Sequence, residues 1–118
     1  MKTLIAFALM LPLMASAQEW TSKDTALELT YLVFHVADWS QTKYIVSHPE
    51  NHRESNIILG ERPSNAEINR YFILTGMLHV GIAYALPDKW RQAFQIFTIG
   101  FEAGVVARNY NLGVRLEF

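Results

Sequence analysis

Apolar residues along the chain gather in long segments whose spacing fits helices better than strands. Residues 71–86 contain one side chain that titrates near neutral pH, His79, and residues 93–107 contain one charged side chain, Glu102. Residues 47–63 contain two prolines, one glycine and a cluster of charges, which is typical of a loop. The pattern predicts an all-α fold, a small bundle of three helices over residues 22–46, 64–86 and 88–110 with a loop at 47–63.

Two of the helix boundaries carry local signals. The stretch Ser64-Asn65-Ala66-Glu67 fits a capping box, in which the Ser64 hydroxyl accepts from the Glu67 amide and the Glu67 carboxylate accepts from the Ser64 amide. Pro87 cannot continue a helix but is favoured at the start of one. It therefore predicts the end of the second helix and the beginning of the third.

Residues 1–17 have the layout of a secretory signal peptide. Lys2 is followed by an apolar run over residues 4–14 and by the small triplet Ala15-Ser16-Ala17, after which cleavage is expected. The apolar run is shorter than the roughly 20 residues that a membrane-spanning helix needs. We therefore expect an exported protein with a single helical domain over residues 18–118.

Two observations favour a membrane location for this domain. The chain has no cysteine, so a small exported domain cannot be stabilised by disulfides and needs its own core, a metal, partners or a bilayer. The second helix also lacks the broad polar face of a helix in a soluble bundle. We expect three transmembrane helices in a bacterial inner membrane, and a soluble bundle in the periplasm is the alternative.

Charge gives an orientation and limits the partners. With the N-terminus in the periplasm after signal cleavage, six basic residues fall on the cytoplasmic side and three on the other, in line with the positive-inside rule. Without Lys2 the chain carries nine basic and eleven acidic residues, and no basic patch points to a nucleic acid. The expected partners are the lipid bilayer and either a second copy of the chain or another membrane protein.

Polar residues recur on one side of each predicted helix when the residues are placed at 100° intervals. Five in the first helix fall within about 80°, five in the third within about 60°, and the second contributes a narrower polar and small-residue arc. We expect these three seams to face one axis. They are Asp24, Glu28, His35, Asp38 and Thr42 in the first helix, Asn69, Gly76, His79 and Ala83 in the second, and Arg91, Gln95, Thr98, Glu102 and Asn109 in the third.

The candidate site lies in the middle of these seams. An ionised carboxylate in apolar surroundings is unfavourable unless it is paired, protonated or bound to a metal, which applies to Asp38 and Glu102. With His35 and His79 they form a candidate ligand set for a divalent metal ion such as Zn²⁺, Mn²⁺ or Fe²⁺. A proton relay or a pocket for a small polar ligand, with Thr42 added, uses the same residues.

Some seam residues also have a purely structural explanation. Asp24, Glu28 and Arg91 lie near helix ends, where we expect solvated or interfacial charges. His79 taken alone fits an ordinary hydrogen-bonded core histidine.

One stretch carries a resemblance to known proteins. Asp38 and Thr42 are followed by the loop Glu54-Ser55-Asn56-Ile57-Ile58-Leu59-Gly60 and by Pro63-Ser64. Over residues 38–64 the chain resembles uncharacterised small membrane proteins of bacteria and phages with a D-x-x-x-T helix end and an E-x-N-P-x-L-G loop, with Ile57 in place of the proline. The resemblance implies a multi-helix membrane protein in which Asp38, Thr42, Glu54 and Asn56 have structural or functional weight.

The loop also has an interpretation from its residues alone. Glu54 and Asn56 are expected to cap exposed backbone amides, while residues 57–59 pack against the bundle and Gly60 turns the chain.

Three functions fit these features. The first is a small integral membrane protein in an accessory role, whose polar seam binds a small polar ligand or a metal ion. The second is a membrane-embedded metal-dependent hydrolase that uses His35, Asp38, His79 and Glu102. The third is a phage-type structural membrane protein, such as a pore former or an exclusion factor, that works by helix association.

Overall fold

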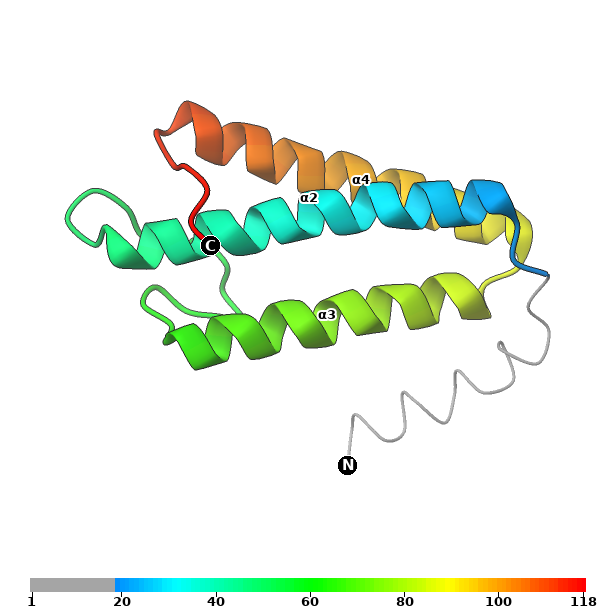
Figure 1. Cartoon of the computed structure of the whole chain (residues 1–118), viewed down its shortest axis with the longest axis horizontal. Coiled ribbons are helices and arrows are strands. Elements are labelled where there is room, and N and C mark those ends of the chain that lie inside the picture. The colour runs from blue at the N-terminus through cyan, green and yellow to red at the C-terminus, as the bar shows by residue number, and fades with distance from the viewer. Residues whose placement is uncertain (1–18) are drawn as a thin grey trace.

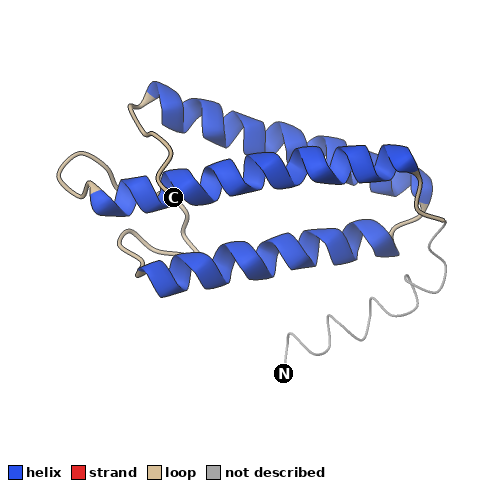
Figure 2. Cartoon of the chain, in the orientation of Figure 1, coloured by secondary structure: helices blue, strands red, loops and turns tan. Residues whose placement is uncertain are grey.

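Over the residues that the structure describes, the protein is an all-α bundle of three helices, as the sequence predicts (Figure 1, Figure 2). The structure, a computed structural model, describes residues 19–118, and the predicted signal peptide over residues 1–17 lies outside them. The helices are α2 (Ser22–Ser47), α3 (Asn65–Ala85) and α4 (Asp88–Asn111).

Local sequence signals account for where these helices begin. The Ser64–Glu67 capping box is formed as predicted, with the Glu67 amide donating to the Ser64 hydroxyl over 3.1 Å. A second capping box, which the sequence analysis did not identify, opens α2 between Thr21 and Asp24. Pro87 is the residue before α4, and α3 ends two residues earlier.

The long helix α2 makes its most extensive contact with α4. The two run parallel, while α3 runs antiparallel to α2 on the other side (Figure 1). The C-terminal tail, residues 112–118, turns back to α2, where the Glu117 amide donates to the Ser40 hydroxyl over 2.5 Å and Val114 is buried. This arrangement places the polar seams of α2 and α4 in register.

The distribution of polarity is inverted relative to a typical globular protein. Among residues 19–118, nine polar or charged residues are buried against seven apolar ones, and large apolar side chains are exposed on all three helices. The buried polar residues are Asp24, Glu28, His35, Ser40, Gln41, Thr42, His79, Arg91 and Gln95.

Within residues 19–118, none of the helices has both the length and the apolar content that crossing a bilayer requires. The prediction that the three helices are transmembrane is therefore not supported, and the fold stands as a three-helix bundle.

Candidate functional site

The seams of α2 and α4 form a ladder of polar contacts along the bundle. Its rungs join residues at an almost constant offset of 67 or 68 positions, from Asp24–Arg91 at one end to Gln41–Asn109 at the other. Parallel helices keep such a constant offset because both rise by about 1.5 Å per residue. The prediction that these seams face each other is confirmed for α2 and α4.

The first rung is a buried ion pair. Arg91 Nη1 donates to Asp24 Oδ2 over 2.8 Å, and both side chains are fully buried. The Arg91 guanidinium also donates to the carbonyls of Ala83 (2.7 Å) and Leu86 (3.1 Å) at the end of α3. Burial by itself raises the pKa of Asp24, but the hydrogen bonds from Thr21 and Arg91 outweigh it and lower the pKa below its usual value.

The second rung is centred on Glu28. His79 Nδ1 lies 2.5 Å from Glu28 Oε1, and Gln95 Nε2 donates to Glu28 Oε2 over 3.0 Å. The other ring nitrogen of His79 lies 2.7 Å from Thr98 Oγ1. The expectation that Asp24, Glu28 and Arg91 are solvated or interfacial was therefore wrong, because α3 and the facing helix cover these ends of the seams.

Tyr31 connects the second rung to the third. Its ring stacks on His79 with the centroids 3.4 Å apart, and its hydroxyl donates to His35 Nδ1 over 3.3 Å. Burial, together with the nearby carboxylates Glu102 and Glu28, raises the pKa of Tyr31, so the hydroxyl keeps its proton. His35 Nε2 donates to the Phe72 carbonyl over 2.9 Å, which assigns the proton of the neutral ring to Nε2.

The third rung brings together three of the predicted site residues. His35 Nδ1 lies 3.9 Å from Glu102 Oε1, while Glu102 Oε2 is buried without a hydrogen-bond partner. Burial and the adjacent Glu102 carboxylate, with a contribution from Glu54 in the loop, raise the pKa of Asp38 to about 8. Asp38 therefore holds a proton at neutral pH next to Glu102.

The remaining predicted residues have structural partners. Thr42 Oγ1 donates to the Asp38 carbonyl of its own helix over 2.9 Å. Asn56 Oδ1 accepts from the amides of Ile58 (2.9 Å) and Leu59 (3.4 Å), and Glu54 Oε1 accepts from the Asn56 amide over 3.0 Å. The predicted capping roles of Glu54 and Asn56 are confirmed.

The expectation that residues 57–59 pack against the bundle was wrong for two of them, since Ile57 is 94% and Ile58 77% exposed. The capped turn directs their side chains to the outside.

The predicted metal set is not assembled. His79 lies at the level of Glu28, whereas His35 lies about two turns and Asp38 nearly three turns further along α2, beside Glu102 of α4. Across the part of the chain that the structure describes, no three His, Cys, Asp or Glu side chains form a group that could hold a metal ion.

Glu28, His79 and Thr98 have the order of a carboxylate–imidazole–hydroxyl relay, the arrangement that activates a nucleophile in some hydrolases. The Thr98 hydroxyl, however, also donates to the Phe94 carbonyl over 2.9 Å. Thr98 lines neither the groove between α2 and α3 nor the groove beside α4 and the tail. A substrate has no path to it there, and the relay acts as an interhelical contact.

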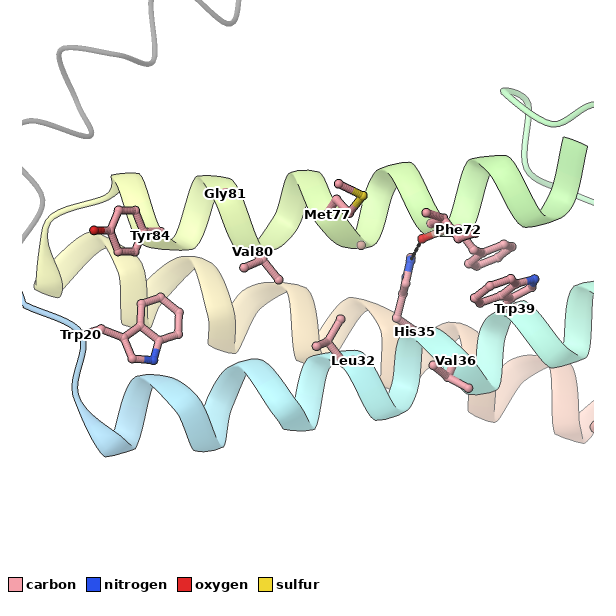
Figure 3. A pocket seen from close by; sticks show the side chains of 12 residues that line it. Trp20, Leu32, His35, Val36, Trp39, Phe72, Met77, Val80, Gly81 and Tyr84 are labelled. Carbon is pink, nitrogen blue, oxygen red and sulfur yellow. Dashed lines mark hydrogen bonds between the residues drawn. The ribbon is translucent and has the colours of Figure 1, made fainter.

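A groove with a volume of about 710 Å³ lies between α2 and α3. Figure 3 shows Trp20 and Tyr84 at one end and Trp39 and Phe72 at the other. His35 is the one ladder residue in its lining, and its Nε2 is already bound to the Phe72 carbonyl. The groove suits an apolar occupant better than a polar ligand.

Sequence reasoning missed Tyr31, Gln41 and the importance of Glu28. A signal was present, because Asp24, Glu28 and His35 are spaced by four and seven residues, and Arg91, Gln95 and Glu102 repeat this spacing. Matched spacing of complementary groups is what two parallel helices in register require.

Comparison of the chain with family models, with curated proteins and with solved structures gave no match. The resemblance over residues 38–64 therefore stays a prediction.

Proposed function

We propose that the protein is a small membrane-associated accessory protein whose apolar exterior contacts lipid and whose polar ladder joins the helices. The observation that carries the proposal is the inverted polarity, with charged and polar groups buried and large apolar groups exposed. In water this distribution is unfavourable, because monomeric soluble proteins rarely expose apolar patches larger than a few hundred Å².

The location of the exposed side chains favours lipid over a single protein partner. They lie on the outward faces of all three helices, for example Leu29 and Val33 on α2, Leu74 and Leu78 on α3, and Phe97 on α4. One partner protein covers one face, whereas acyl chains cover every face at once. The groove between α2 and α3 offers an additional apolar surface of this kind.

The sequence of α2 and α4 supports the same interpretation. The polar side chains that interrupt their apolar segments, including Glu28, Gln95 and Arg91, are buried in the ladder. The outward surface of each helix is therefore more apolar than its average composition. The resemblance to small membrane proteins over residues 38–64 points in the same direction.

Among the other functions considered, the metal-dependent hydrolase has the least support. Such an enzyme needs a cluster of metal-binding side chains and an accessible nucleophile. The described residues form no such cluster. A structural protein that works by helix association is compatible with membrane association.

Vesicle flotation tests the proposal. The purified full chain, diluted from mild detergent into vesicles of phosphatidylcholine and phosphatidylglycerol, should float with them and resist a wash at high pH. The double variant Leu74→Gln, Leu78→Gln should bind less, because it places two amides on the exposed face of α3. Glu61→Gln, in the exposed part of the loop, is the matched control and should float like the wild type.

A chain that stays monodisperse in buffer without detergent and does not float would refute membrane association.

A further inference from the structure

The outward face of α4 carries two glycines that the described part of the chain does not require. A Cβ added at Gly100 or Gly104 would meet no atom within 4 Å, and neither residue has a positive φ. A glycine inside a helix is less favourable than alanine, because its backbone loses more conformational freedom on folding. At Gly76, by contrast, an added Cβ would meet the His35 ring at an ordinary van der Waals distance of 3.5 Å.

These glycines form a flat strip on α4. Positions four apart differ by about 40° around a helix, and the strip lies on the side opposite Arg91, Gln95 and Glu102. Large apolar side chains border it on both sides: Ile96 is 57% exposed, Phe97 73% and Phe101 63%. The face therefore combines a shallow depression with projecting side chains.

We infer that this face of α4 binds the same face of a second copy of the chain. A two-fold symmetric interface must be self-complementary, because the same patch lies on both sides of it. Here the side chains that project, Phe97 and Phe101, can lie over the strip that Gly100 and Gly104 leave open in the other copy. Small residues four apart allow two helices to approach closely in this manner.

The area is sufficient for a dimer. Phe97 and Phe101 together expose roughly 300 Å², taking about 200 Å² for each side chain. With Ile96 and the exposed small residues of the strip, each copy would cover roughly 500 Å², or about 1,000 Å² in total, which reaches the lower limit for a specific interface.

Helix α3 lacks this combination. Gly81 is an open helical glycine as well, but it lines the groove between α2 and α3 together with Met77, one turn earlier. This makes Gly81 a matched control, since it has the same backbone, the same open surroundings and no partner glycine.

The oligomeric state of the full chain tests this inference, and the inference does not depend on membrane association. Sedimentation velocity of the purified chain in mild detergent, over a range of concentrations, should show a reversible dimer. Gly100→Leu and Gly104→Leu should each raise the Kd of the dimer by about tenfold or more, because a branched side chain holds the helices apart. Gly81→Leu should leave the Kd unchanged.

All three variants should keep the helical circular dichroism of the wild type, since an added Cβ meets nothing within 4 Å. A wild type that is monomeric at every concentration would overturn the inference, as would equal weakening by Gly81→Leu. A dimer that forms equally in buffer without detergent would contradict the membrane proposal and still support this interface.

Discussion

The protonated carboxyl of Asp38 makes the stability of the bundle depend on pH. Its pKa is about 8 in the folded protein against an ordinary value of 3.8, because the half-buried side chain is partly desolvated and lies beside Glu102 and Glu54. Between these two values the folded chain holds a proton that the unfolded chain releases. The free energy of unfolding should therefore be highest below pH 4 as far as this group is concerned, and should fall as the pH rises towards 8.

The size of the effect follows from the pKa. One pKa unit corresponds to about 1.4 kcal/mol, which sets the largest possible slope per pH unit. Water and side-chain relaxation around a pair near the surface reduce this value, and an effect of roughly 2 kcal/mol between pH 5 and pH 8 is a realistic expectation. Of the neighbouring groups, the Glu102 carboxylate acts most strongly on Asp38, and Glu102 in turn lies 3.9 Å from the His35 ring.

The variant Asp38→Asn isolates this contribution. The amide keeps the shape and the hydrogen-bonding capacity of the protonated carboxyl but does not titrate. Urea unfolding followed by circular dichroism, at several pH values from 5 to 8 in one mild detergent, should show a weaker pH dependence for the variant than for the wild type. The variant should gain most at pH 8, where the wild type begins to carry a charge at this position.

Glu61→Gln serves as the control, because Glu61 is exposed in the loop and its replacement should leave the slope unchanged. Parallel curves for the wild type and Asp38→Asn over the whole range would refute the reasoning. They would mean that Asp38 is ionised in the folded protein and is stabilised by a contact other than those described above.

Two other outcomes concern the ends of the ladder and the metal hypothesis. Arg91→Met leaves the charge of Asp24 buried without its partner and should lower the free energy of unfolding by about 3–5 kcal/mol, measured by urea unfolding. Lys89 is exposed two residues earlier, and Lys89→Met should change the free energy of unfolding by less than about 0.5 kcal/mol. Equal effects of the two variants would contradict the buried ion pair. Treatment with EDTA should leave the Tm unchanged, because no metal-binding group forms among residues 19–118; a clear fall in Tm would revive the metal hypothesis.

Sequence alone determined the helices and the composition of their faces. Helix starts depend on contacts within four residues, as at Ser64 and Glu67, and such contacts are visible in the sequence. The angular position of each side chain is likewise fixed by helix geometry, so the facing seams of α2 and α4 could be predicted before any packing was known.

Only the tertiary structure decided which seam residues meet. A helical wheel gives the angle of a residue but not its height along the axis. Glu28 and Asp38 share a stripe, yet ten residues separate them by about 15 Å. The antiparallel register of α3 places His79 at the height of Glu28, where it cannot reach Asp38.

Burial near the helix ends was also a tertiary outcome. Asp24 and Arg91 lie within the first turns of their helices, where isolated helices expose such charges to solvent. In the bundle the end of α3 lies against these two residues. Arg91 donates to the carbonyls of Ala83 and Leu86, which lie at the end of α3, where carbonyls have no amide donor within the helix. The local sequence decides which residue is charged and on which face of its helix it lies. The partner of that charge is 67 residues away in the sequence, and only the packing of the three helices brings the two together.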